Sequence, residues 1–161
     1  MPVLTRQQLV LKLAKLGRKV NLLGVDAGTE YVGVSYVVDA FGEGSPSPYK
    51  TLKLSKEDSM LELTAMLNCV DAGVVGWPLD KNQLETESCK TVDNFLTTFS
   101  DYDWVKENEY NSSHEGNGIL HQINPLLCQN KDLQDQVAAC IILHNFMGWS
   151  RDFLSQKNVS N

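Results

Sequence analysis

The sequence contains no run of apolar residues long enough to cross a membrane. No stretch approaches the roughly 20 consecutive apolar residues that a bilayer-spanning helix needs. The first residues also lack the short apolar core of a secretory signal. We therefore expect no membrane partner, and the cytoplasm is the expected compartment.

Cysteine is scarce, and the four cysteines are not spaced as a metal site. Cys69, Cys89, Cys128 and Cys140 form no CxxC pair, and no histidine stands at the spacing typical of a zinc ligand. Free thiols in a reducing compartment are the simplest interpretation.

Positive charge is also in short supply. The chain has 14 Lys and Arg residues against 20 Asp and Glu residues, which gives a formal net charge of −6. This balance argues against binding of nucleic acid through a broad basic surface, because phosphate contacts come from Lys and Arg. It does not exclude an enzyme whose site is a carboxylate cluster, since bound cations reverse the local field.

The basic residues that are present gather near the beginning of the chain. Residues 5–19 contain no acidic side chain, and their basic side chains are Arg6, Lys12, Lys15, Arg18 and Lys19. Thr5 and Gln8 have the spacing of a capping box, and leucines recur on one helical face. An ordinary basic helix is one interpretation. The other is a targeting segment for an organelle, either a plastid or a mitochondrion.

The length of 161 residues fits one domain of common size. Runs of β-branched and aromatic residues predict strands, and apolar residues at helical spacing predict helices. The predicted strands cover residues 20–25, 31–38, 49–54, 72–77 and 104–106; the predicted helices cover residues 5–19, about 55–67, 84–99 and 132–147. Ser55 and Asp58 are the expected caps of the second helix. This order predicts an α/β fold, a mixed five-stranded sheet with helices on both faces.

Three parts of the chain are expected to differ in role. Residues 20–148 hold the strands and helices of the main domain. Residues 1–19 are expected to form an N-terminal basic helical extension, and residues 149–161 a C-terminal tail that is frayed over residues 151–161.

Asp26 ends a strand that is otherwise apolar. Alternation along the strand puts Asp26 on the same face as Leu22 and Gly24. One interpretation is that Asp26 caps the turn that follows, as Asp often does. The other is a functional carboxylate at the end of the sheet. Gly28, two residues later, would let a ligand approach the backbone closely.

Asp135 is unusual in a similar way, because it lies on the apolar side of its predicted helix. It shares a face with Ala138, Ala139, Ile142 and Phe146. The two alanines would let this helix lie close to the sheet and bring the carboxylate near the strand ends. The alternative is an acid in the first turn that is favoured by the helix dipole.

The residue pattern does not single out a third acid. Glu109 lies in an acidic, polar stretch together with Asp101, Asp103, Glu107 and Glu115, and any of these acids can be solvated surface. Two-metal hydrolysis of a phosphodiester needs a third acid, because several carboxylates must hold two cations about 4 Å apart. Hard cations such as Mg²⁺ prefer oxygen ligands of this kind.

Four short sequence segments, taken in their order along the chain, match the pattern of a known family. Residues 22–29 read Leu-Leu-Gly-Val-Asp-Ala-Gly-Thr, residues 74–79 read Val-Val-Gly-Trp-Pro-Leu, residues 108–113 read Asn-Glu-Tyr-Asn-Ser-Ser, and residues 131–143 hold an Asp followed by Ala-Ala and Ile-Leu. Together they resemble the YqgF family, also described as RuvX-like or Holliday-junction-resolvase-like nucleases and as pre-16S rRNA processing nucleases. That family has a ribonuclease H-like fold, and the resemblance covers roughly residues 20–148.

The resemblance implies the roles of particular residues. It assigns metal binding and catalysis to Asp26, Glu109 and Asp135, with Mg²⁺ or Mn²⁺ as the cofactor. The candidate substrate-binding residues are Gly28, Thr29, Ser112, Ser113 and Lys131.

The resemblance also implies a function. We expect a metal-dependent nuclease that hydrolyses phosphodiester bonds in structured nucleic acid, either in precursor rRNA 5′-end processing or on Holliday junction-like DNA. Its expected partner is structured RNA or branched DNA, and the chain is expected to be a monomer or a homodimer. One alternative is a catalytically weakened binding module in ribosome assembly or transcription. Another is phosphotransfer of the sugar-kinase type, which rests only on the Asp-Ala-Gly-Thr turn and needs two such domains.

The sequence departs from the family pattern at positions that normally carry positive charge. Glu30 and Tyr31 follow the Asp-x-Gly-Thr segment where the family usually has basic residues, and Tyr110 replaces an arginine. Each change removes positive charge from where a phosphate backbone should lie. Lysines that could compensate, or could be ordinary surface, are Lys81, Lys106 and Lys131. Trp77 either packs at its strand end or stacks on a base.

Overall fold

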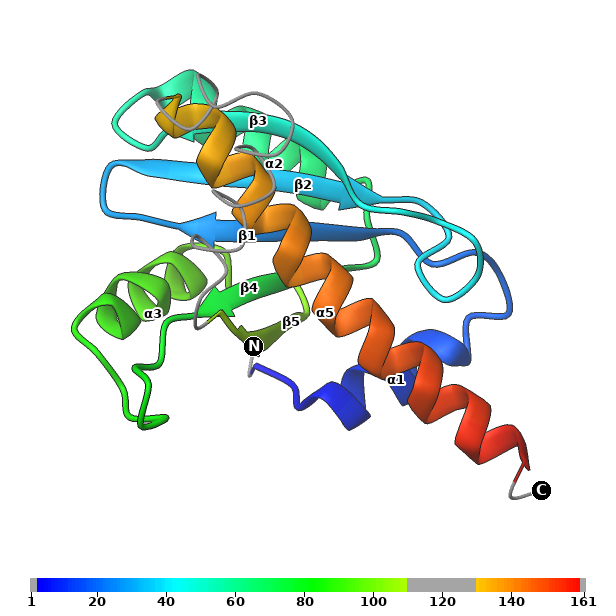
Figure 1. The fold of residues 1–161 in the computed structure, drawn as a ribbon. Helices are drawn as coiled ribbons and strands as arrows, with labels where there is room; N and C mark the ends of the chain where they lie inside the picture. Colours follow the sequence, from blue (N-terminus) through cyan, green and yellow to red (C-terminus); the bar gives the residue numbers. More distant parts are fainter. Residues whose placement is uncertain (1–2, 110–129, 160–161) are drawn as a thin grey trace.

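The computed structural model of the chain describes residues 3–109 and 130–159, in which helices cover both faces of a five-stranded sheet (Figure 1). The strands are β1 (Leu22–Ala27), β2 (Tyr31–Val37), β3 (Ser47–Lys53), β4 (Ala72–Trp77) and β5 (Trp104–Asn108). The helices are α1 (Arg6–Ala14), α2 (Glu57–Leu67), α3 (Ser88–Thr98) and α5 (Lys131–Val159).

The sheet has the strand order β3-β2-β1-β4-β5. β2 runs antiparallel to both β1 and β3, whereas β4 runs parallel to β1 and β5. The β1–β2 hairpin closes with a hydrogen bond of 2.9 Å from the main-chain N–H of Gly28 to the carbonyl of Tyr31. The predicted mixed five-stranded sheet is therefore confirmed.

Alternating side chains divide the core between the two faces of the sheet. Leu22 belongs to a cluster with Phe146 and other residues of α1 and α5. Its neighbours Leu23 and Val25 point the other way and pack with residues of α2 and α3 such as Leu63. The face under α5 is the one that carries the acids discussed below.

The N-terminal helix is part of this core. The predicted capping box is present: Thr5 Oγ1 accepts a hydrogen bond from the N–H of Gln8, and the N–H of Thr5 donates to Gln8 Oε1. Leu9 and Val10 are fully buried. The main-chain N–H of Leu4 also donates to the carbonyl of Trp104, at the edge of β5. The expected basic extension is thus a helix packed against the main domain.

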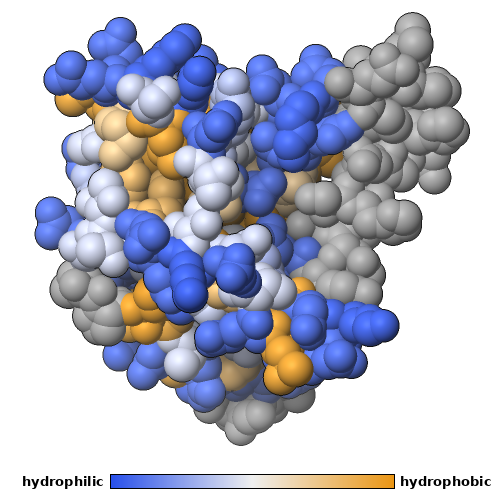
Figure 2. All heavy atoms as spheres, turned by 90° about the vertical axis from the view of Figure 1, so that its left-hand side faces the viewer, coloured by the Kyte–Doolittle hydropathy of each residue, from blue (hydrophilic) through white to orange (hydrophobic). Residues whose placement is uncertain are grey.

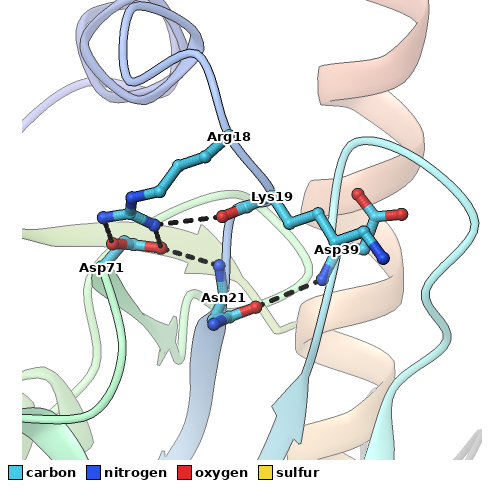
Figure 3. A network of polar contacts seen from close by, with 5 residues as sticks. All are labelled: Arg18, Lys19, Asn21, Asp39 and Asp71. Carbon is cyan, nitrogen blue, oxygen red and sulfur yellow. Dashed lines mark hydrogen bonds and ion pairs between the residues drawn. The ribbon is translucent and has the colours of Figure 1, made fainter.

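A polar network fixes the connection between α1 and β1 (Figure 3). The guanidinium of Arg18 donates to both carboxylate oxygens of Asp71, at 2.6 and 3.1 Å, and to the carbonyl of Lys19. The N–H of Asn21 also donates to Asp71, and its side-chain oxygen accepts from the N–H of Asp39. The Arg18 hydrogen bond is the main cause that lowers the pKa of Asp71 below its ordinary value. Arg18 therefore serves as an intramolecular ion-pair partner.

Two helix starts differ from the predictions. α2 begins after Lys56, which makes no side-chain cap hydrogen bond, so the expected caps Ser55 and Asp58 are wrong. Asp58 instead lies in the first turn, where an acid is favoured by the helix dipole. α3 begins at Ser88 rather than at residue 84, because the Asp80 carboxylate accepts the main-chain N–H groups of Asn82 and Leu84 and folds residues 80–84 into a turn.

The last helix is much longer than predicted. α5 has 29 residues and runs to Val159, so the expected fraying is wrong for residues 151–159. Its continuation packs against α1: the Arg6 guanidinium lies 5.3 Å from the Trp149 ring centre, and Trp149 and Phe153 pack against the core cluster that contains Leu9 and Leu13. Among the described helices, even α5 lacks the length of apolar sequence that a membrane crossing requires.

Candidate active site

Three acidic residues from separate elements lie where β1 and β5 end under α5. Asp26 is the fifth residue of β1, and Glu109 directly follows β5. Asp135 lies in the N-terminal part of α5, and its exposed fraction is 7%. Because β1, β4 and β5 run parallel, their carboxyl ends share one edge of the sheet (Figure 1).

Asp26 and Glu109 are direct neighbours, since their side chains share a hydrogen bond. The position of Glu109 is set by its main-chain N–H, which donates to the carbonyl of Trp77 at 3.1 Å. Its carboxylate lies over Gly76, where an added Cβ would come 2.5 Å from Glu109 Oε2. A residue with a side chain at position 76 would therefore push Glu109 out of this place.

Asp135 approaches Asp26 from the helix above. Asp26 is paired across the hairpin with Gly33. A Cβ at Gly33 would overlap the main-chain carbonyl of Asp135, and a Cβ at Gly24 would collide with Leu143 of the same helix. The glycines let α5 rest directly on the backbone of the sheet. Ala138 and Ala139 are fully buried in this contact, which confirms the predicted close approach of the helix.

Lys131 supplies positive charge to this cluster. Its Nζ lies 2.7 Å from Asp135 Oδ1, one helical turn along α5. This hydrogen bond is the main cause that raises the pKa of Lys131, and the charges of Asp135 and Asp26 act in the same direction. The lysine side chain stays largely exposed.

The electrostatics of the cluster are unfavourable to the charged form of Asp26. Burial, and then the negative charge of Asp135, raise the pKa of Asp26 from its ordinary 3.8 to about 6. The hydrogen bond with Glu109 and the charge of Lys131 act against this rise. A cation beside Asp26 would relieve the same repulsion.

A pocket of about 310 Å³ opens over this cluster. Its lining residues are Asp26, Gly28, Thr29, Glu30, Tyr31, Lys131 and Asp135. The structure thus brings five of the predicted site residues together. Of the others, Glu109 contacts Asp26 but is not part of the lining, and Ser112 and Ser113 lie outside the described residues.

The cluster offers the oxygen ligands that a hard divalent cation requires. Asp26 is the common neighbour of the other two acids, and the described residues that line the pocket include carboxylates but no cysteine or histidine. Among residues 3–109 and 130–159, however, no three acidic, histidine or cysteine side chains stand close enough to hold a metal ion without adjustment. The donor chemistry therefore fits Mg²⁺ or Mn²⁺, and the carboxylates would have to turn to enclose it.

The steric role of Gly24, Gly33 and Gly76 was not predicted from the sequence. Each lies on the α5-facing side of a different strand, and each would clash with α5 or Glu109 if it carried a Cβ. The available signal was a glycine inside an otherwise β-branched strand, which often marks close approach of another backbone.

Two other residues have structural roles. Glu107 is almost completely buried and forms an ion pair with Arg6, whose Nε lies 2.8 Å from Glu107 Oε2, so this acid anchors α1 to β5. The ring of Trp77 lies under the Lys106 ammonium at 3.6 Å, and Lys106 also pairs with Asp93 at 3.2 Å. Trp77 and Lys106 therefore pack on each other.

The model of a family described as "RuvX: Holliday junction resolvase" matches residues 20–148 of the chain. The chain belongs to the RuvX family. The matched segment contains all five strands and the three acids of the candidate site. The suspected YqgF or RuvX-like relationship is thus confirmed.

A curated relative agrees with this membership in the RuvX family. It is described as a "Putative pre-16S rRNA nuclease" of Mycoplasmopsis synoviae (strain 53), and it is 32% identical over 81 residues. The aligned region is 48% of this chain and spans only 59% of the relative's length.

Solved structures give weaker likenesses for this RuvX family member. RuvC of Thermus thermophilus has a TM-score of 0.41 and 12% identity, with 80% of this chain and 95% of that chain covered. The same protein in complex with a Holliday junction substrate also has a TM-score of 0.41 and 12% identity. Pelota of Archaeoglobus fulgidus has a TM-score of 0.41 and 8% identity, with 96% and 41% covered. At these scores the likenesses carry no argument about function.

Proposed function

We propose that the chain is a divalent-metal-dependent nuclease that hydrolyses phosphodiester bonds in structured nucleic acid. The observation that carries this proposal is the placement of the partly buried Asp26 between Glu109 and Asp135. Membership in a family of resolvases supports the same activity. Precursor rRNA 5′-end processing and the cutting of Holliday junction-like DNA are the two substrate classes to be tested.

In this proposal the three acids hold Mg²⁺ or Mn²⁺. The carboxylates of Asp26, Glu109 and Asp135 supply the oxygen ligands; Asp26 lies on β1, Asp135 lies on α5, and Glu109 directly follows β5. When bound, such a cation activates water and stabilises the leaving oxygen of the phosphodiester. The main chain of Asp135 lies close over Gly33, and the side chain of Glu109 lies close over Gly76, so the two glycines leave the space that these acids occupy.

The remaining pocket residues would hold the substrate backbone. Thr29 is exposed at the hairpin turn, and its hydroxyl can donate to a phosphate oxygen. Gly28 lets the backbone of the turn approach that phosphate. Lys131 bonds to Asp135 in the described conformation, and its exposed ammonium is the positive charge of the pocket that can meet a phosphate.

The test is a cleavage assay with purified protein. We expect Mg²⁺- or Mn²⁺-dependent cutting of a four-way DNA junction or of a precursor rRNA 5′-end fragment, and we expect Asp26→Asn and Asp135→Asn to abolish it. Asp152→Asn is the matched control, because Asp152 is exposed on the same helix and outside the acidic pocket. Failure to cut either substrate with either ion would overturn the proposal.

A second candidate function is a binding module with weakened catalysis. It is favoured by Glu30 and Tyr31, which line the pocket where a phosphate backbone would lie and bring one negative and no positive charge. Under this alternative, Asp26→Asn leaves the biological activity intact. A complementation assay with this variant in cells that lack the protein distinguishes the two functions.

A further inference from the structure

A second pocket adjoins the acidic one on the other side of the hairpin turn. It has a volume of about 340 Å³ and shares Gly28 and Thr29 with the acidic pocket. Its lining residues are Gly28, Thr29, Leu54, Met60, Thr91, Asn94, Phe95, Thr98 and Phe99. Figure 2 faces this end of the molecule and shows apolar surface in a recess that hydrophilic residues frame.

Among the residues that the structure describes, no charged residue lines the second pocket, although the chain as a whole carries a net charge of −6. A phosphate would find no counter-charge there, and a cation would find no carboxylate ligand. Met60, Phe95 and Phe99 supply apolar walls, while hydroxyl and amide groups supply hydrogen-bonding positions. This combination suits a neutral, flat ligand with polar edges.

The polar groups come from one face of α3. Thr91, Asn94 and Thr98 recur at helical spacing, next to the buried Phe95. The hydroxyl of Thr98 donates to the main-chain carbonyl of Asn94 at 3.1 Å. The side-chain amide of Asn94 and the hydroxyl of Thr91 have no hydrogen-bond partner among the residues that the structure describes. Both remain available to a ligand.

We propose that this second pocket binds an unpaired nucleobase next to the phosphodiester that the acids cut. The inference rests on the proposed nuclease function and deepens it. A nucleobase is a neutral ring that packs on apolar side chains and forms hydrogen bonds along its edge. The shared turn at Gly28 and Thr29 lets one strand place its phosphate at the acids and the adjoining base beside α3. The preferred substrate is therefore nucleic acid with unpaired nucleotides at the cut site.

The test compares two strands that differ only in their bases. Each is a labelled duplex with a short unpaired segment, which is intact in one version and abasic in the other, and both RNA and DNA versions are made. Binding is measured by fluorescence anisotropy in EDTA, so that no cutting occurs. We expect the wild-type chain to bind the intact version at least about fivefold more tightly than the abasic version.

Variants of α3 assign this preference to the pocket. Asn94→Ala and Thr91→Val should remove the preference for the intact version and leave the affinity for the abasic version unchanged. Thr97→Val is the matched control, because Thr97 is exposed on the same helix and outside the pocket. Asn94 is exposed, so Asn94→Ala should fold normally even if Thr91→Val does not.

The outcomes separate the two proposals. Equal affinity for the intact and abasic versions, or a preference that both α3 variants retain, overturns the base pocket even if the chain cuts nucleic acid. A preference that the α3 variants remove supports the pocket even if no cleavage is detected, in which case only the nuclease proposal fails. If neither version binds in the RNA or the DNA series, the base pocket is wrong.

Discussion

Gly33 lies directly beneath the main chain of Asp135, with no room for a side chain between strand and helix. Gly33 is also the cross-strand partner of Asp26. The lack of a Cβ at this position therefore sets how closely the carboxylates of β1 and α5 approach each other. The geometry of the site depends on a residue that has no functional group.

Gly33→Ala should lower both stability and activity. The methyl group must push α5 away from the sheet, and overpacking of this kind typically costs about 1–3 kcal/mol. Urea unfolding measures the stability, and the junction or rRNA assay measures the activity. Gly148→Ala is the control, because an added Cβ there meets no other part of the described chain within 4 Å apart from the backbone of its own helix. Alanine inside α5 should stabilise the chain by roughly 0.5–1 kcal/mol. A Gly33→Ala protein as active and stable as wild type would contradict the steric account.

Asp26→Asn should stabilise the metal-free chain at neutral pH while it abolishes activity. The pKa of Asp26 is about 6 in the folded chain against an ordinary 3.8, so the folded state binds the proton more tightly. Stability is then lost as pH rises from about 4 to about 6, and a shift of this size corresponds to a loss on the order of 2–3 kcal/mol. The neutral amide of Asn removes this loss and can still hydrogen-bond Glu109.

Thermal unfolding in EDTA between pH 4 and 8 measures this effect. The melting temperature of Asp26→Asn should exceed that of wild type at pH 7 and approach it at pH 4. Asp152→Asn, on the exposed side of α5, should follow wild type throughout. If the wild-type chain were more stable than Asp26→Asn at pH 7 in EDTA, the negative charge of Asp26 would not destabilise the folded chain, and the account would be contradicted.

Arg6→Met should destabilise the chain more than Lys12→Met. Arg6 is paired with Glu107, whose side chain is 2% exposed, whereas Lys12 pairs with the less buried Asp103. Removal of one partner of a buried pair leaves an uncompensated charge and costs about 3–5 kcal/mol. Loss of an exposed pair typically costs about 1 kcal/mol or less. Urea unfolding compares the two variants.

The double variant Arg6→Met/Glu107→Gln separates charge from packing. Removal of the buried charge should recover part of the stability that Arg6→Met loses. If the double variant were as unstable as the sum of the two single variants, Arg6 would act through its packing on Trp149 rather than through Glu107.

The sheet could be predicted from the sequence because its signals are local. Apolar strands alternate with turn residues, and the Ala-Gly-Thr segment after Asp26 marks the first hairpin. The position of Asp135 on an apolar helix face was also visible in the sequence. Glu109 was not, since other acids surround it, and only the resemblance to the RuvX family pointed to it.

The features that the sequence analysis missed depend on distant partners. Glu107 and Arg6 are 101 residues apart, so nothing near Glu107 indicated that it is buried. The extension of α5 beyond residue 148 depends on its packing against α1. The polar composition of residues 155–159 gives no local sign of a helix there. The late start of α3 depends on the hydrogen bonds that Asp80 accepts. Local propensity describes none of these contacts.

The central claim is that Asp26, Glu109 and Asp135 hold one divalent metal site. Calorimetric titration of Mn²⁺ into the metal-free chain tests it most directly, with Asp26→Asn and Asp135→Asn as the variants and Asp152→Asn as the control. We predict saturable binding by the wild type and the control, and affinity at least about tenfold weaker in both site variants. Absence of saturable binding by the wild type, or equal affinity in all four proteins, would contradict the claim.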